Sequence, residues 1–161
     1  EKQPHDRELL EKAGFCHQKL GDYSRAISTY ENIGLSGEQN LWTLKNLGIC
    51  YRKTENYKEA LEVYESAAAL QPDDTSIESL RGYCRLKLGD YETALKHYFK
   101  IEYLNPGNQK ILRPIAWCYF ASGELEKAEA ERKRHEEEEK AEAERKRKEE
   151  EEKAEEEKKR K

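Results

Sequence analysis

The sequence predicts an all-α protein built from repeated helix–turn–helix units, with its last helix extended into a long charged segment. Three observations lead to this fold class. Four cysteines follow one another at a constant spacing of 34 residues. Between them, apolar residues recur with the period of amphipathic helices, interrupted by short polar turns. From Lys127 onward the chain contains only Glu, Lys, Arg, Ala and His135.

The 34-residue repeat extends beyond the cysteines, and a period of this length is typical of stacked structural units. Small residues are expected to let two helices approach closely, and a later aromatic to fill the gap between units. Leu125 continues the series that begins with Tyr23. The series are Cys16, Cys50, Cys84 and Cys118; Gly14, Gly48, Gly82 and Ala116; Ala26, Ala60, Ala94 and Ala128; Tyr30, Tyr64 and Tyr98; and Tyr23, Tyr57 and Tyr91.

Each unit is predicted to hold two helices. In the second unit, Leu44, Leu47 and Tyr51 have the spacing of one helix face, and residues 57–68 repeat the pattern. The polar segment KTEN between them predicts a turn.

Local signals predict where helices start and bend. Residues 75–78 and 36–39 both fit the capping box that begins a helix. Pro114 lies within the first helix of the fourth unit, where a proline is expected to kink it. Glu78, Arg81 and Arg85 occupy positions where apolar groups are usual in the first helix of a unit. Capping accounts for Glu78, while the arginines extend over the helix surface or pair with Glu78, and the sequence gives no firm account of them.

The chain resembles tetratricopeptide repeat (TPR) proteins, whose pattern over 34 residues is a large residue, Leu-Gly, Tyr, Ala, an aromatic, Ala and Pro. The resemblance implies a right-handed superhelix, an α-solenoid of helix–turn–helix repeats. The predicted parts are a lead-in at 1–6, repeats at 7–40, 41–74 and 75–108, a partial fourth repeat at 109–128 and a charged helix at 129–161.

The cysteines are expected to be packing residues. Cys50 lies near Arg52 and Lys53, and cationic neighbours can activate a thiol. The repeat favours burial, because all four cysteines share one slot beside a small residue. Packed helices about 8–10 Å apart keep equivalent slots too distant for disulfides, and no zinc-ligand spacing is present. We therefore expect slow alkylation at all four sites, no metal and no cofactor.

The resemblance also implies a concave groove lined by the first helix of each repeat. Apolar side chains with a cationic rim suit an extended or helical partner peptide that has apolar anchors and acidic flanks. The alternative is that the apolar residues pack between repeats and the cations are merely solvated. The predicted groove residues are Phe15, Trp42, Lys45, Asn46, Ile49, Arg52, Lys53, Leu80, Tyr83, Lys110, Arg113, Trp117 and Phe120.

Some TPR proteins hold a partner's C-terminal carboxylate with Lys, Asn and Arg side chains from successive repeats. This chain supplies only Asn46 in one reading frame of those slots, and Lys45 with Lys110 in another. Because a carboxylate needs converging donors, we do not expect this clamp.

The charged tail repeats itself, since residues 127–139 recur at 140–152 with one change. Glu followed four residues later by Lys stabilises a helix, and no heptad seam predicts a coiled coil. We expect a helix that begins near Glu124, docks through Leu125 and Ala128, and continues beyond Arg132 as a solvated rod; residues 124–161 reach about 57 Å. A disordered tail and an engineered spacer are the alternatives.

Composition limits the function. Neither part of the chain is strongly basic, which argues against nucleic acid, and no apolar run reaches the ~18 residues of a membrane span. No phosphate loop or catalytic constellation suggests an enzyme. We expect a monomeric, non-enzymatic scaffold, the alternative being a structural array in which the long helix is a ruler. Retained thiols suggest the cytoplasm, and the absence of methionine suggests an excerpt of a longer protein.

Overall fold

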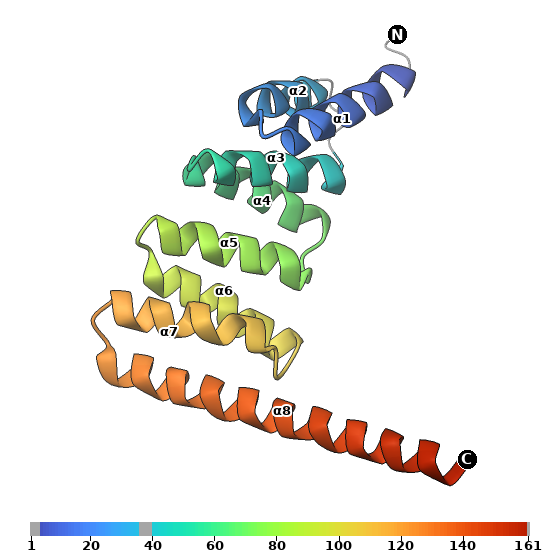
Figure 1. Cartoon of the computed structure of the whole chain (residues 1–161). Helices are drawn as coiled ribbons and strands as arrows, with labels where there is room; N and C mark the ends of the chain where they lie inside the picture. The colour runs from blue at the N-terminus through green and yellow to red at the C-terminus, as the bar shows by residue number, and fades with distance from the viewer. Residues whose placement is uncertain (1–3, 36–39, 161) are drawn as a thin grey trace. The chain divides into compact units, whose positions relative to one another are not determined.

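Every regular element that the structure describes is a helix (Figure 1). The computed structural model describes residues 4–35 and 40–160, with side chains for 7–34 and 40–153. The chain divides at Pro106 into two compact units, Glu1–Pro106 and Gly107–Lys161.

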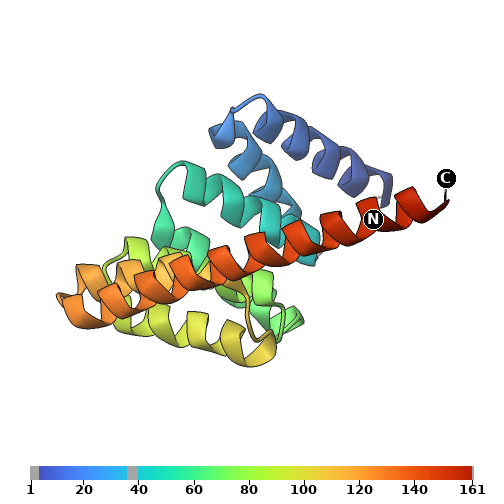
Figure 2. The same cartoon turned by 60° about the horizontal axis from the view of Figure 1, so that its bottom comes forward.

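The first unit contains three helical hairpins. Neighbouring helices pack against each other in chain order, and Figure 2 shows the hairpins from a second direction. This confirms the predicted helix–turn–helix units. The helices are α1 (Pro4–Lys19), α2 (Tyr23–Leu35), α3 (Leu41–Lys53), α4 (Tyr57–Leu70), α5 (Thr75–Lys87) and α6 (Tyr91–Leu104).

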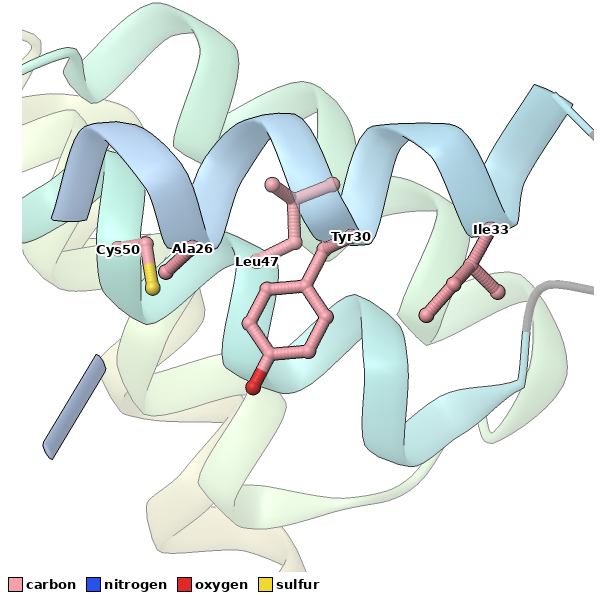
Figure 3. Packing of buried hydrophobic residues seen from close by; sticks show 5 residues of the cluster. All are labelled: Ala26, Tyr30, Ile33, Leu47 and Cys50. Carbon is pink, nitrogen blue, oxygen red and sulfur yellow. The ribbon is translucent and has the colours of Figure 1, made fainter. Parts of the chain in front are cut away.

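The recurring small, aromatic and cysteine positions form the core. Ala26, Tyr30 and Ile33 of α2 pack with Leu47 and Cys50 of α3, and all five are buried (Figure 3). The next junction repeats the alanine, tyrosine and cysteine of this arrangement, with Ala60 and Tyr64 of α4 and Cys84 of α5. Fully burying a side chain of this size contributes about 1.5–3 kcal/mol, so these junctions hold successive hairpins together.

Glycine is required where the two helices of a hairpin approach. A Cβ added at Gly48 would lie 2.4 Å from the ring of Tyr64, and one at Gly14 would lie 2.7 Å from that of Tyr30. The predicted role of the small residue is therefore confirmed.

The turn within each hairpin uses a left-handed residue. Gly21, Gly89 and Gly123 have φ values of 78°, 80° and 86°, and Glu55 takes the same position with φ 62°. Because a side chain disfavours this region, the second hairpin carries strain at Glu55.

One helix start differs from prediction. Asp74, not Thr75, caps α5, and its carboxylate accepts hydrogen bonds from the backbone N–H groups of Ser76 and Ile77. Glu78 is therefore not a capping-box partner. Asn40 caps α3 by accepting from the N–H of Thr43, and the other predicted box, residues 36–39, lies outside the described residues.

The second unit consists of a 3-10 turn η1 (Gln109–Ile111), α7 (Leu112–Ala121) and α8 (Leu125–Arg160). The expected kink at Pro114 is wrong, because α7 begins at Leu112 and Pro114 lies in its first turn, where no N–H donor is needed.

Helix α8 packs on α7, but its docked part does not end at Arg132 as expected. Glu131 and His135 keep only 17% and 18% of their side chains exposed. Further along, Glu142 accepts a hydrogen bond from Gln109 of η1. Polar side chains thus continue the contact after the apolar ones stop.

Candidate functional site

In the first unit, aromatic side chains of the first helices lie partly exposed and in mutual contact. The rings of Phe15 on α1 and Trp42 on α3 are 6.1 Å apart, and they remain 39% and 43% exposed. Trp42 also meets the edge of the buried Tyr30 at 6.1 Å. Large apolar groups left accessible in this way are typical of interaction surfaces.

Cations lie over these rings. The Arg52 guanidinium is 5.0 Å from the ring centre of Tyr83, and the Lys87 ammonium is 5.7 Å from it. Lys19 lies 5.0 Å from the ring centre of Phe15. The Arg52 contact connects α3 with α5. All three contacts place positive charge beside partly exposed rings, which is favourable for acidic and apolar groups together.

Two other predicted residues hold the scaffold itself. Lys45 donates to Asp74 at 2.6 Å and to Ser76 at 3.3 Å, which ties α3 to the start of α5. Burial acts to raise the pKa of Asp74, but these and its other hydrogen bonds outweigh burial and lower that pKa to about 2. Asn46 is buried and donates to the Trp42 carbonyl at 2.8 Å.

The remaining predicted residues of the first unit flank this surface. Ile49 and Leu80 are half-buried, and Lys53 is exposed. The structure thus brings Phe15 together with Trp42 and Arg52 together with Tyr83. We call the partly exposed first-helix residues Phe15, Trp42, Ile49, Arg52, Leu80 and Tyr83 the first-helix surface.

The second unit carries its own aromatic surface on α7. Trp117 and Phe120 lie 5.6 Å apart and are 55% and 56% exposed. They border an open hollow of about 350 Å³ between α7 and α8. Lys110 and Arg113, also predicted, are exposed on η1 and α7. We call this feature the α7–α8 hollow, lined mainly by Ala116, Trp117, Phe120, Leu125, Ala128 and Arg132.

The cysteines divide into two classes. Cys50, Cys84 and Cys118 are fully buried, and burial raises the pKa of each thiol to about 11. Cys16 is exposed, which contradicts the expected burial of all four. Within the first unit, Cys50 packs with Ala26 and Tyr30 of α2 and Cys84 with Ala60 and Tyr64 of α4, whereas no described helix precedes α1. In the described ranges, no group of Cys, His, Asp and Glu residues has metal-site geometry.

A buried ionic cluster in the first unit was not predicted. The Glu78 carboxylate, 1% exposed, accepts from Lys100 at 2.9 Å and from Arg81 at 3.0 Å, and contacts His97 Nδ1 at 2.8 Å. Arg81 also binds Glu65 at 2.5 Å. In the sequence, the only indication of this cluster was Arg81, which had no firm explanation. The structure explains Arg81 as a partner of Glu78.

The second unexplained arginine has a simpler role. Arg85 pairs with Asp90, the cap of α6, at 3.3 Å. It therefore links the two helices of its own hairpin.

Comparisons with known proteins agree with the helical repeats. Sequence models described as tetratricopeptide repeat match residues 6–73, 45–109 and 85–146. No curated protein sequence matches significantly. Among solved structures, MamA from Desulfovibrio magneticus RS-1 is similar with a TM-score of 0.77 at 23% identity, over 86% of this chain and 78% of that one. PcrH from Pseudomonas aeruginosa is similar with a TM-score of 0.60 at 20% identity, over 80% and 95%.

At these identities the structural likeness concerns the fold alone. Within the part of the chain that the structure describes, no helix is both long and apolar enough to cross a membrane.

Proposed function

Because the chain is a tetratricopeptide repeat protein, we propose that it is a non-enzymatic scaffold for protein–protein interaction. It binds a partner peptide or helix on its first helices. The observation that carries this proposal is the pairing of partly exposed rings with cations, above all Arg52 on Tyr83 and Lys19 on Phe15.

The chemistry of the first-helix surface defines the partner. Phe15 and Trp42 offer apolar area to an anchor side chain, and aromatic residues of this kind are enriched among binding hot spots. The cations beside the rings favour carboxylates next to that anchor. The expected partner is therefore a segment with apolar anchors and acidic flanks.

Selection from a displayed peptide library tests the proposal. Selected peptides are expected to combine large apolar residues with Glu or Asp. Arg52→Glu should weaken their binding at least tenfold. Lys58→Glu, which makes the same charge change at an exposed position of α4, should not. Lys45 is a poor target because its loss would disturb the cap of α5. Selected peptides without this chemistry, or equal binding by both variants, would refute the proposal.

We also propose that α8 acts as a spacer beyond its docked part. Its ion pairs support a helix that continues without apolar packing: Glu142–Lys146, Glu144–Lys148 and Arg147–Glu151 lie at 2.6, 2.8 and 3.6 Å. In the alternative, the chain is a structural array without a ligand and this helix is the functional part. The alternative gains if library selection yields no peptide.

A further inference from the structure

The fourth repeat departs from the other three at the contact between its two helices. In the first three repeats a glycine faces a buried tyrosine 16 positions later, as with Gly14 and Tyr30. The fourth repeat has Ala116 and Arg132 at this separation. Both residues line the α7–α8 hollow of about 350 Å³. The hollow therefore opens beside the slots that a glycine and a tyrosine ring occupy elsewhere in the chain.

The first repeat shows what such a surface accepts. There, Trp42 of the following helix lies on Phe15 and Tyr30 at ring-centre distances of 6.1 Å each. The equivalent positions of the fourth repeat, 102 residues later, hold Trp117 and Arg132. An arginine can also stack on an aromatic face. An apolar cavity of about 150 Å³ already admits benzene, so this hollow has room for a larger ring.

The charges at the rim favour an acidic neighbour of that ring. Arg113 is exposed at the edge of the hollow. Arg132 binds Glu136 at 2.6 Å, and Glu129 is paired with Lys133 at 3.2 Å. Exposed pairs contribute little, so a partner's carboxylate can replace Glu136 on Arg132.

We propose that the α7–α8 hollow is a receptor site for one aromatic side chain of an acidic partner segment. The ring lies between Trp117 and the stem of Arg132, and a neighbouring carboxylate binds the two arginines. This site deepens the proposed scaffold function, and it uses residues of the second unit alone.

Fluorescence of Trp117 tests the site directly. The chain has two tryptophans, so Trp42→Phe leaves Trp117 as the single reporter. The probe is a blocked pentapeptide with a central phenylalanine between pairs of glutamates. We expect a saturable change in emission, with a dissociation constant on the order of 1 mM or below, as for a single anchor. The same peptide with a central alanine should bind at least tenfold more weakly.

Filling the hollow provides the decisive variant. Ala116→Gly together with Arg132→Tyr restores the pair found in the first three repeats, and it should raise the melting temperature while weakening the probe at least tenfold. The glycine is needed because a Cβ at this slot lies within about 3 Å of the ring in those repeats. Lys140→Tyr, which adds a tyrosine at an exposed position of α8 outside the lining of the hollow, is the matched control and should bind normally.

A second variant covers the possibility of misfolding. Phe120→Glu changes a side chain that is 56% exposed, and its carboxylate should repel the acidic probe. Full binding by both hollow variants, or equal binding of the alanine peptide, would overturn the site. Arg52→Glu should leave this probe unaffected, so failure of the hollow can be distinguished from failure of the first-helix surface.

Discussion

At the residue scale, one repeated position has two different chemistries. Cys50, Cys84 and Cys118 are buried, whereas Cys16 is exposed on α1. Leu9, seven residues before Cys16 on the same helix, is 62% exposed. The reactivity of each thiol therefore depends on its burial, and not on its local sequence.

Alkylation of the native protein should separate the two classes. We expect Cys16 to react with iodoacetamide within minutes, and the three buried thiols at least a hundredfold more slowly, because thiolate formation and access are both suppressed. Peptide mass spectrometry over time measures each site. All four should react alike in urea, and rapid native modification of Cys50 would contradict the prediction.

The strained turn at Glu55 offers a second residue-level test. Its φ of 62° is the conformation that glycine adopts at the equivalent position of the other hairpins. Glu55→Gly should therefore raise the free energy of unfolding by about 1 kcal/mol. Urea denaturation measures the change. Lys53→Gly, in the last turn of α3, should instead lower stability, and a destabilised Glu55→Gly protein would argue against strain.

Acid should destabilise the first unit through two carboxylates. Burial tends to raise the pKa of Glu78, but Lys100 and His97 bind it and Arg81 adds charge, so its pKa is lowered; that of Asp74 falls to about 2. A lowered folded-state pKa contributes stability that is present above the unfolded value, near pH 4, and is lost as the pH falls.

The free energy of unfolding should thus decline by roughly 1–3 kcal/mol from pH 5 to pH 2 through these groups. Asp74→Asn with Glu78→Gln should flatten the profile, since asparagine still caps a helix. Glu126→Gln, a change at an exposed carboxylate, is the control. Parallel profiles for the parent and the double variant would show that other groups dominate.

At the element scale, the close contact between the helices of a hairpin sets which substitutions are tolerated. Gly48→Ala brings a methyl group to 2.4 Å from the Tyr64 ring, whereas Gly82→Ala brings one only to 3.0 Å from Tyr98. Overpacking costs about 1–3 kcal/mol, and alanine regains about 1 kcal/mol of helix propensity. Gly48→Ala should therefore destabilise by about 1–2 kcal/mol and Gly82→Ala by much less, as measured in urea.

The helical hairpins could be predicted because period and small residues determine them together. Local signals failed where tertiary contacts intervened: Glu78 has the sequence of a capping residue, yet α6 supplies the partners that bury it. The candidate site was predictable only as a set of slots. Lys45 binds Asp74, and Arg52 lies over Tyr83, because neighbouring hairpins pack together. A local sequence pattern does not predict these contacts.

At the scale of the whole molecule, α8 has two parts with different surroundings. Residues 125–142 belong to the packed part of the second unit, because α8 packs on α7 and Glu142 accepts a hydrogen bond from Gln109 of η1. Beyond Ala143 the helix rests on charged side chains and on pairs such as Glu144–Lys148. Removal of the two parts should therefore have different consequences.

A chain ending at Ala143 should unfold in urea at the same midpoint as the full chain, with circular dichroism reduced by the lost helix alone. A chain ending at Arg132 also loses the contacts of His135 and Glu142, and its second unit should be less stable by about 1–2 kcal/mol. In the full chain, the helical signal of the residues beyond Ala143 should decrease with added salt, since their ion pairs are exposed and salt screens them. If truncation at Ala143 lowers the midpoint as much as truncation at Arg132, the far part of α8 stabilises the repeats and is not a spacer.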